Sequence, residues 1–436
     1  MNWKQIYDSK IVSADEAVRA IKSGDRVFLT GNCSVPHRLL KALVDYAPNL
    51  ENVEICQALT VAGSEYVAPE MEGHLRVNTQ FISANVRKAV QEGRADFTPV
   101  LLSELPLLFK KKILPLNVAL VHLSPPDEHG YCTFGVESGL TKTAAESADL
   151  IIAQVNQRMP RMLGDTFIHV KDLDYIVPVD DPLAELPMES DGNNEIVEKI
   201  AGFIAERIPD GATLQLGIGA IPNAVLRFLK SKKDLGVHSE LFSDSIIEMV
   251  EAGIINGSRK TFHPGKVIAG FLIGTHRLYE WAHDNPAIEL LRTEYVNNPF
   301  NVARNDNMVA INSAIEIDLT GQVCADSIGP KFFSGVGGQM DFIYGAGMSN
   351  GGLPVIALPS TACMKDGSVI SRITPMLKQG AGVVTSRNHI HCVATEFGMV
   401  DLYGRSIRER THLLISIAHP DFREDLKKQA AALHYI

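Results

Sequence analysis

Hydrophobic and polar positions follow two periods that alternate along the chain. Short runs rich in β-branched residues are typical of buried strands, and stretches whose apolar positions recur every three to four residues are typical of amphipathic helices. The runs that predict strands are residues 25–31, 53–59, 117–124 and 150–155, and the stretches that predict helices include 36–47 and 139–148. This alternation indicates α/β layers with a largely parallel sheet.

A change in composition divides the chain before its midpoint. Residues 175–194 are polar and rich in Pro and Asp, which is typical of a link between domains. A length of 436 residues is also too great for one ordinary core, so two domains of about 200 residues each are expected. We predict an N-terminal domain over 1–190 and a C-terminal domain over 191–436, whose α/β structure starts near Asn193.

Two segments far apart in the chain share one pattern: a Gly, an apolar strand, a second Gly, a Pro five residues later and an amphipathic helix. Gly31 and Pro36 in the first segment correspond to Gly217 and Pro222 in the second. Glycine permits a tight turn after a strand, and the start of the helix offers unpaired N–H groups to an anion. The pattern favours two similarly built α/β domains with ligand loops at the carboxyl ends of their strands. The alternative, that any two strand-to-helix turns look alike, stays open.

Charge and composition limit the kinds of partner. The net charge of −10 provides no basic surplus to neutralise phosphates, which argues against nucleic acid as the main partner. The six cysteines are scattered without a CxxC pair, a pattern that fits the reducing cytoplasm. No apolar signal segment and no run of about 18 apolar residues is present, so we expect no membrane partner.

Several short motifs are candidates for chemistry. Gly217 and Gly219 form an anion-binding turn without the third Gly of a dinucleotide fingerprint, and Gly337 and Gly338 lie in a second glycine-rich turn. The stretch SPPDEHGYCTFG, residues 124–135, carries two acids and one His. A metal site is the less favoured interpretation there, and a hydrogen-bonded corner the more favoured one.

The common nucleophile motifs are absent. The sequence contains no GxSxG elbow, no Walker A loop and no HExxH helix, so a carboxylate nucleophile remains open. Glu240 and Glu294 both lie in polar stretches, and residue type alone does not separate them.

Six motifs occur in order along nearly the whole chain: FISANVRKAVQEGRADFTPVLLSELP, SPPDEHGYCTFG, LGIGAIPNAV, HSELFSDS, SGVGGQMDF and IAHPDFREDL. Together they resemble the acetyl-CoA hydrolase/transferase family, a branch of the class I CoA-transferases. Within that family they are most like the 4-hydroxybutyrate and butyrate:acetate CoA-transferases. The resemblance implies two related doubly wound α/β domains of CoA-transferase type, with the active site between them.

The resemblance also implies site residues. The family glutamate lies in an (S/T)-E-(L/M)-x-S-D setting, which residues 239–244 match, so the catalytic role falls on Glu240. Ser239, Ser243 and Asp244 of this motif are expected to position the Glu240 side chain. Amides of residues 32–35 are expected to contribute to the oxyanion site. The implied CoA-binding positions are Gln215, Leu216, Gly217, Ile218, Gly219, Gly337, Gly338 and Lys365.

The activity implied by the resemblance is transfer of CoA between a short-chain acyl-CoA and a free carboxylate through a glutamyl-CoA thioester. Acetyl-CoA with 4-hydroxybutyrate or butyrate is the expected pair, CoA enters as a substrate, and no metal or permanently bound cofactor is needed. A homodimer or higher homo-oligomer is expected. An acyl-CoA hydrolase, a non-catalytic CoA-binding protein and a phosphosugar isomerase remain alternatives, and Glu294 remains the rival nucleophile.

Overall fold

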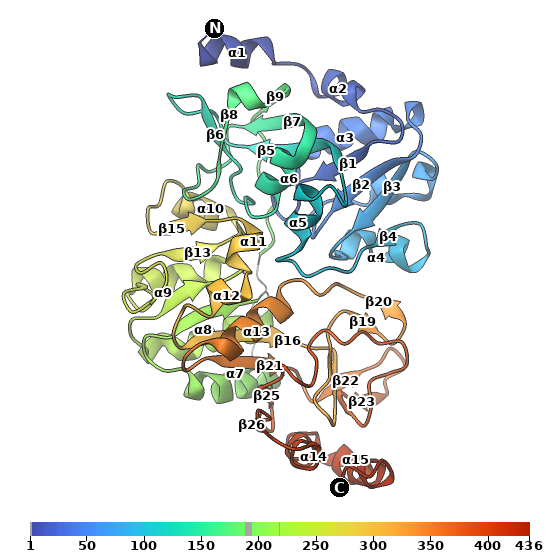
Figure 1. The fold of residues 1–436 in the computed structure, drawn as a ribbon, viewed down its shortest axis with the longest axis vertical. Coiled ribbons are helices and arrows are strands. Elements are labelled where there is room, and N and C mark those ends of the chain that lie inside the picture. The colour runs from blue at the N-terminus through green and yellow to red at the C-terminus, as the bar shows by residue number, and fades with distance from the viewer. Residues whose placement is uncertain (1, 188–193, 218) are drawn as a thin grey trace. The chain divides into compact units, whose positions relative to one another are not determined.

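The computed structural model describes residues 2–187, 194–217 and 219–436. The chain forms two compact units, and it passes between them more than once (Figure 1). Unit 1 contains residues 1–187, 241–244 and 267–296, and unit 2 contains residues 188–240, 245–266 and 297–436. The predicted boundary between residues 190 and 191, like Asn193, falls outside the described residues, so it stays a prediction.

Unit 1 is built on a seven-stranded sheet in the order β4-β3-β2-β1-β5-β7-β9, in which every pairing is parallel. The four predicted strand runs and the two predicted helices are confirmed as β1, β2, β5, β7, α3 and α6. The sheet strands are β1 (Arg26–Leu29), β2 (Val53–Gln57), β3 (Leu75–Thr79), β4 (Asp96–Phe97), β5 (Leu116–Leu123), β7 (Ala148–Asn156) and β9 (Tyr175–Val179).

Alternate side chains of a strand point to opposite faces of the sheet. Both faces are apolar here, and helices cover both. Val27 and Leu29 of β1 belong to one hydrophobic core and Phe28 belongs to the other. Helices α3 and α4 contribute to the first core, and α5 and α6 contribute to the second. The helices of this part of unit 1 are α1 (Trp3–Ser9), α2 (Ala14–Ala17), α3 (His37–Tyr46), α4 (Ala84–Gln91), α5 (Leu105–Lys110) and α6 (Thr141–Ser147).

Two later segments complete unit 1. In the first, β12 (Leu241–Phe242) pairs in parallel with β14 (Phe271–Leu272) of the second. The second segment also contains β13 (Val267–Ala269), α10 (His276–Ala282), β15 (Ile288–Leu290) and α11 (Thr293–Val296). The antiparallel pair β6 (Tyr131–Thr133) and β8 (Phe167–His169) lies in the first 187 residues.

Unit 2 has a sheet in which β11, β10, β16, β21, β25 and β26 follow one another. All of these pairings are parallel except that of β26 with β25. The strands are β10 (Thr213–Leu216), β11 (Gly236–His238), β16 (Met308–Ser313), β21 (Leu353–Ala357), β25 (Cys392–Thr395) and β26 (Gly398–Asp401). The mixed α/β class with parallel sheets is therefore confirmed.

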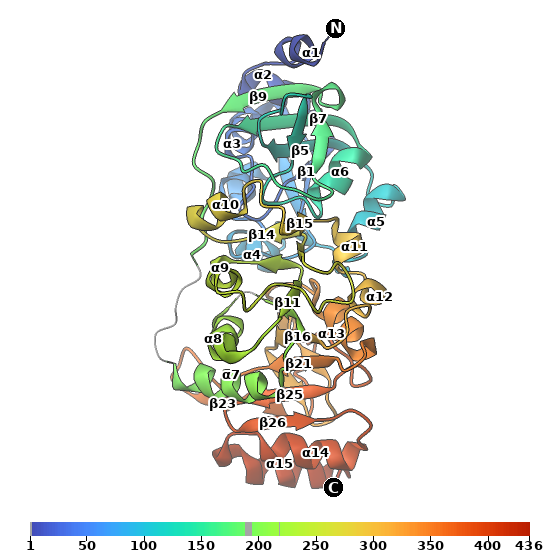
Figure 2. The same ribbon diagram turned by 90° about the vertical axis from the view of Figure 1, so that its left-hand side faces the viewer.

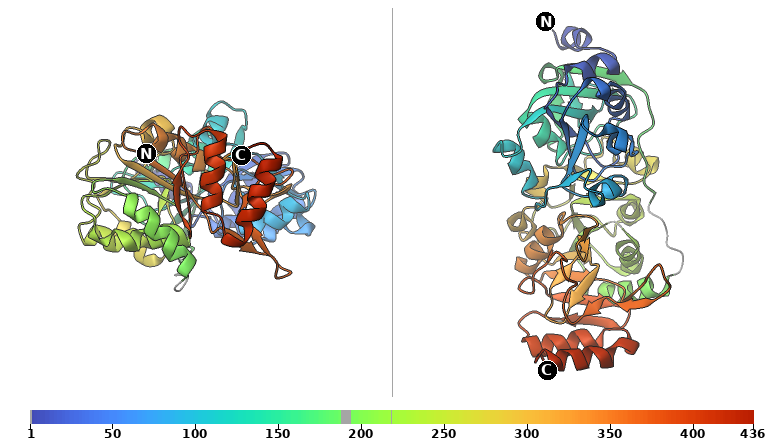
Figure 3. Two further views of the ribbon diagram at one scale, coloured as in Figure 1. Left: turned by 90° about the horizontal axis from the view of Figure 1, so that it is seen from below. Right: turned by 90° about the vertical axis from the view of Figure 1, so that its right-hand side faces the viewer.

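Helices and small sheets of two or three strands accompany the main sheet of unit 2. Helices α7 and α8 pack against each other (Figure 2), and α14 and α15 lie side by side at the carboxyl-terminal end (Figure 3). The helices are α7 (Glu195–Arg207), α8 (Ala220–Phe228), α9 (Ile247–Glu251), α12 (Pro299–Val302), α13 (Gln339–Met348), α14 (Ile407–Ser416) and α15 (Pro420–Ala432). The small strands are β17 (Glu316–Asp318), β18 (Val323–Cys324), β19 (Ser327–Ile328), β20 (Lys331–Phe332), β22 (Thr361–Cys363), β23 (Val369–Ser371) and β24 (Ile373–Thr374). Across the described residues, we find no helix with the length and apolar character needed to cross a bilayer.

The strand order of each unit reverses at one point. The reversal lies between β1 and β5 in unit 1 and between β10 and β16 in unit 2. Loops at the carboxyl ends of strands next to such a reversal are the usual ligand sites of open α/β sheets. The predicted Gly31 and Gly217 turns both follow a strand at this point, so the repeated pattern in the sequence corresponds to a shared topology.

Candidate active site

The carboxyl ends of β10, β11 and β16 bring several polar side chains of unit 2 to one sheet edge. Gln215 at the end of β10 accepts a hydrogen bond from the amide of Asn312 on β16, at 3.0 Å between Nδ2 and Oε1. The Ser239 hydroxyl accepts from the Leu216 N–H at 3.3 Å and donates to the Leu216 carbonyl at 3.1 Å. Because Ser239 is fixed to β10 in this way, the next residue, Glu240, is placed at the same edge.

The Glu240 carboxylate is partly buried between two donors. The Asn297 amide donates to Glu240 Oε2 at 3.0 Å, and the backbone N–H of Gly338 forms a second hydrogen bond to the carboxylate. A Cβ atom on Gly338 would lie 2.0 Å from Glu240 Oε2 and 2.4 Å from the Asn297 amide nitrogen. Residue 338 must therefore be glycine for the carboxylate to occupy this position.

The ionisation of Glu240 is strongly perturbed. Burial, helped by the negative charge of Asp341, raises the pKa of Glu240 from its ordinary 4.5 to about 7. The donors on Asn297 and Gly338 act in the opposite direction, since they favour the charged form. A carboxyl group with a pKa near neutrality is both a stronger base and a stronger nucleophile than an ordinary glutamate, and perturbed groups of this kind cluster at functional sites.

The predicted glycine turns occupy different settings. Gly219 has φ +135° and caps α8, and Gly337 has φ +56°, so backbone conformation requires glycine at both positions. Gly217 has no neighbour closer than 3.8 Å to an added Cβ, so space does not require glycine there. Ile218, also predicted to bind CoA, lies outside the described residues. Of the predicted CoA-binding residues, the structure brings Gly338 into direct contact with Glu240.

Lys365 lies away from these contacts, at the exposed turn of the antiparallel hairpin formed by β22 and β23. The structure therefore places an exposed cation at this turn.

The N-terminal loop, residues 32–35, follows β1 in unit 1. Asn32 adopts φ +52°, and its N–H donates to the Leu59 carbonyl at 2.6 Å. Burial raises the pKa of the Cys33 thiol, which lies next to the Tyr279 hydroxyl. Because Cys33 is almost fully buried, its thiol is a packing group and not a nucleophile.

The rival glutamate has a different environment. Glu294 Oε1 accepts hydrogen bonds from Lys110 Nζ at 2.6 Å and from the Thr143 hydroxyl at 2.9 Å, all within unit 1. A carboxylate neutralised by an ammonium group is a weak nucleophile, so the geometry favours Glu240 for that role.

The other acid of the SELFSD motif has a separate function. Asp244 accepts hydrogen bonds from the Thr275 N–H at 3.0 Å and from the Thr275 hydroxyl at 2.5 Å, within unit 1. A Cβ atom on Gly274 would lie 2.1 Å from Asp244 Oδ2, so this loop is closely fitted to the carboxylate. These hydrogen bonds fix the chain that follows Glu240. They do not involve the Glu240 side chain.

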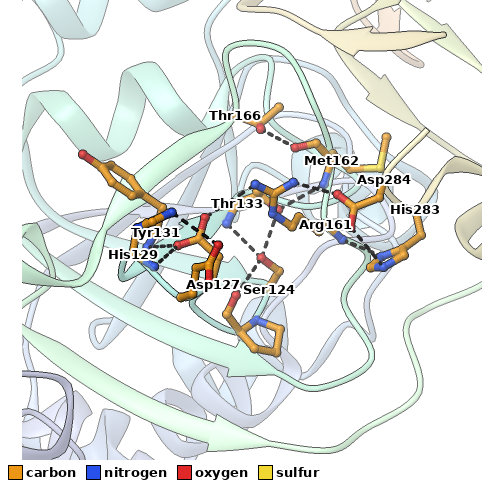
Figure 4. Close-up of polar contacts among 12 residues, drawn as sticks. Ser124, Asp127, His129, Tyr131, Thr133, Arg161, Met162, Thr166, His283 and Asp284 are labelled. Atoms are coloured by element: carbon orange, nitrogen blue, oxygen red, sulfur yellow. Dashed lines mark hydrogen bonds and ion pairs between the residues drawn. The ribbon is translucent and has the colours of Figure 1, made fainter. Parts of the chain in front are cut away.

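The SPPDEHG stretch forms a hydrogen-bonded corner of unit 1 (Figure 4). Asp127 Oδ1 accepts from the N–H groups of His129 and Tyr131 at 2.9 and 3.0 Å, and Oδ2 lies 3.5 Å from the Arg161 guanidinium. The side chains of Glu128 and His129 are exposed. Over residues 2–187, 194–217 and 219–436, no group of three or more His, Cys, Asp or Glu suited to a metal ion is found.

Two residues of the site were not predicted from the sequence. Asn297 contacts Glu240 across 57 positions of the chain, and only its place in a polar VNNP turn marked it. Asp341 lies in the first turn of α13, within the glycine-turn motif that was singled out for its glycines.

Comparison with known proteins relates both parts of the chain to one family. Residues 1–186 match the acetyl-CoA hydrolase/transferase N-terminal domain, and residues 274–430 match the acetyl-CoA hydrolase/transferase C-terminal domain. The chain is 50% identical to a 4-hydroxybutyrate coenzyme A transferase of Clostridium kluyveri, over 98% of this chain and 99% of that protein. It is 38% identical to a butyryl-CoA:acetate CoA-transferase of Anaerostipes caccae, over 99% and 98%. A crystal structure of a 4-hydroxybutyrate CoA-transferase from Porphyromonas gingivalis superposes with a TM-score of 0.85 at 39% identity, covering 99% of this chain and 100% of that one.

Proposed function

The chain belongs to the acetyl-CoA hydrolase/transferase family, and from this premise we propose that it transfers CoA between a short-chain acyl-CoA and a free carboxylate through Glu240. The resemblance of the sequence motifs to that family, and with it the prediction of a CoA-transferase-type enzyme, is confirmed. The observation that carries the proposal is the Glu240 carboxylate, held by Asn297 against a glycine that leaves no room for a side chain.

The first half of the reaction exchanges a thioester for an anhydride. Glu240 Oε1 is the attacking atom in this proposal, because Oε2 is bound by Asn297. The new bond to the acyl carbonyl carbon gives a tetrahedral oxyanion, which collapses as the C–S bond breaks, and CoA leaves as a thiolate. The product is a mixed anhydride between the acyl group and Glu240, so one difficult exchange is divided into easier steps.

The second half transfers CoA to the enzyme. The CoA thiolate attacks the Glu240 side-chain carbonyl carbon, and the anhydride bond to the acyl oxygen breaks. A free carboxylate leaves, and Glu240 carries CoA as a thioester. An incoming carboxylate then repeats these steps in reverse order and leaves as the new acyl-CoA.

The glycine turns and the Asn297 amide have a defined part in these steps. Each tetrahedral intermediate carries an oxyanion, and fixed N–H donors stabilise such charge where water is excluded. The Gly338 N–H and the Asn297 amide already meet the carboxylate from which the Glu240-centred intermediate forms. We assign residues 215–219, Gly337, Gly338 and Lys365 to CoA binding.

Acetyl-CoA with 4-hydroxybutyrate or butyrate is the proposed substrate pair. The family description covers both hydrolysis and transfer, so the alternative is water as the acceptor. Release of free CoA from acetyl-CoA without any carboxylate acceptor would support hydrolysis, whereas acceptor-dependent formation of a new acyl-CoA would support transfer.

The proposal extends to the setting of the enzyme. All six cysteines are unpaired, and five of them are buried, which suits a reducing compartment. We therefore propose a cytoplasmic enzyme. A homodimer or a higher homo-oligomer is proposed because most oligomers of soluble proteins are symmetric homo-oligomers.

The decisive experiment traps the covalent intermediate. The enzyme is incubated with acetyl-CoA and treated with borohydride, which reduces a glutamyl thioester to an alcohol, and the altered residue is located by mass spectrometry. We expect reduction at Glu240 and none in Glu240→Gln. Reduction at Glu294, or no CoA-dependent reduction in an enzyme that exchanges acyl groups, would overturn the proposal. A protein that binds CoA without any exchange would favour the non-catalytic alternative.

A further inference from the structure

Residues 292–296, which lead directly to Asn297, are anchored by several polar contacts. The chain passes from unit 1 to unit 2 between Val296 and Asn297, so Asn297 is the first residue after this passage. Its amide donates to Glu240 Oε2 at 3.0 Å. What fixes residues 292–296 therefore bears directly on the nucleophile.

Arg292 holds the start of this segment through all three of its guanidinium nitrogens. Nε donates to Asp165 Oδ2 at 2.6 Å, and the two terminal nitrogens bind both oxygens of Glu146 at 2.5 and 2.9 Å. Asp165 also accepts from Lys142, which is buried. The paired geometry with Glu146 fixes direction as well as position, because a planar guanidinium meets a carboxylate in one plane.

Glu294 holds the middle of the segment. Its Oε1 accepts from Lys110 on α5 and from Thr143 on α6, and its side chain is only 14% exposed. Between them, the buried Thr293 donates its N–H to the Gly139 carbonyl at 3.0 Å. Three successive residues are thus tied to α5, α6 and the loop before α6.

The residues between these anchors and Asn297 are also held by backbone hydrogen bonds. The N–H groups of Tyr295 and Val296 both donate to the Arg292 carbonyl at 2.9 Å, which closes the turn of α11. Asn298 caps α12 by accepting from the Phe300 N–H at 2.9 Å. Asn297 therefore lies between two closed helical turns, and a shift of Arg292 or Glu294 is transmitted along the backbone.

We propose that Arg292 and Glu294 are positioning residues, which set where the Asn297 amide meets the Glu240 carboxylate. This inference rests on the proposed role of Glu240 as nucleophile. Neither residue touches the reacting atoms in it; both act through Asn297. It gives Glu294 a task that differs from the rival nucleophilic role, and the ion pair with Lys110 is part of that task.

The test compares Arg292→Gln with Asn297→Ala and with the double variant. Arg292→Gln should lower kcat for acyl exchange about 10- to 100-fold, as misplaced catalytic groups do, with KM for acyl-CoA within about twofold. The acid limb of its kcat/KM profile should move to higher pH, as in Asn297→Ala. In the Asn297→Ala background, Arg292→Gln should cost no more than about twofold further.

Two further variants keep the test decisive. Arg26→Gln breaks an ion pair with Glu54 in the same unit at nearly the same exposure, 23% against 21%, and should leave kcat and the pH profile unchanged. Glu294→Gln keeps the shape of the side chain but loses the Lys110 ion pair, so the acid limb of its kcat/KM profile should move in the same direction by a smaller amount. This variant replaces Arg292→Gln in the test if Arg292→Gln fails to fold. Retained borohydride labelling at Glu240 in Glu294→Gln separates positioning from nucleophilic attack.

Independent losses in the double variant, or a loss of kcat with an unmoved acid limb, would mean a merely structural role and would overturn the inference. Absence of acyl transfer in the unmodified enzyme, or labelling that disappears only in Glu294→Gln, would instead overturn the proposed function.

Discussion

The raised pKa of Glu240 should destabilise the folded protein at neutral and alkaline pH. The folded state keeps the proton on Glu240 up to pH about 7, whereas an unfolded glutamate loses it near pH 4.5. Between these values the unfolded state binds fewer protons than the folded state, so the free energy of unfolding falls as pH rises. Replacing the carboxyl by a neutral amide in Glu240→Gln removes this dependence.

The size of the effect follows from the two pKa values. A difference between 4.5 and about 7, at about 1.4 kcal/mol for each pH unit, corresponds to about 3 kcal/mol once the pH exceeds 7. Glu240→Gln should therefore be more stable than the unmodified protein by up to about 3 kcal/mol at pH 8. At pH 4.5 the difference should be limited to the exchange of a neutral acid for an amide.

The assay must report on unit 2, which contains Glu240. Trp3 and Trp281 both lie in unit 1, so tryptophan fluorescence does not follow unit 2 directly. Urea titration with pulsed hydrogen exchange and mass spectrometry reads peptides of β10 and β16 separately at each pH. Glu137→Gln is the matched comparison, because burial raises the pKa of Glu137 to about 7 as well, but that carboxyl lies in unit 1.

The pH dependence of the difference decides the outcome. A stability gap between Glu240→Gln and the unmodified protein that stays constant from pH 4.5 to pH 8 would show that Glu240 titrates normally. A lower stability of Glu240→Gln at pH 8 would show that the carboxylate is a net stabilising group, and the burial argument would fail.

Three other variants address the contacts of Glu240. Gly338→Ala should reduce kcat/KM by at least about 10²-fold, because its Cβ would displace Glu240 Oε2 and so separate the carboxylate from its N–H donors, and losing one such donor usually costs that much. Gly202→Ala, in which the added Cβ meets open space on α7, is the control. Equal activity in the two variants would contradict the geometry. Asn297→Ala should move the acid limb of the kcat/KM profile to higher pH and Asp341→Asn should move it to lower pH, because the first removes a donor to the charged form and the second removes a repelling charge; movement in the same direction would contradict the assignment of causes.

Local pattern predicted the elements of unit 1 but not the full membership of the unit. The runs at 25–31, 53–59, 117–124 and 150–155 became strands because their apolar side chains are covered on both faces. Residues 241–244 and 267–296 also belong to unit 1, although they follow the linker. Periodicity identifies a strand or a helix, but the choice of neighbouring sheet depends on contacts between distant parts of the chain.

The candidate site was accessible to sequence reasoning to the extent that its residues lie in short motifs. Glu240 and Gly338 were singled out by the SELFSD and GGxxDF motifs, and the structure brings them together. Asn297 was not, since its amide reaches Glu240 only after the chain has passed through residues 241–244 and 267–296 of unit 1. The pKa of Glu240 was likewise beyond prediction from residue type, because an ordinary glutamate ionises near 4.5 and the rise comes from burial and from the charge of Asp341.

The interleaved course of the chain limits how this protein can be dissected or rearranged. A fragment that ends at Pro187 would lack residues 267–296, and with them the Gly270 carbonyl that accepts from the Gly139 N–H and the Phe271 backbone that bridges to Glu137. If the gene were split at the linker, part of unit 1 would be encoded with unit 2 in the second polypeptide. The two halves resemble independent modules in topology, yet they can be inherited only as one reading frame or as fragments that reassemble.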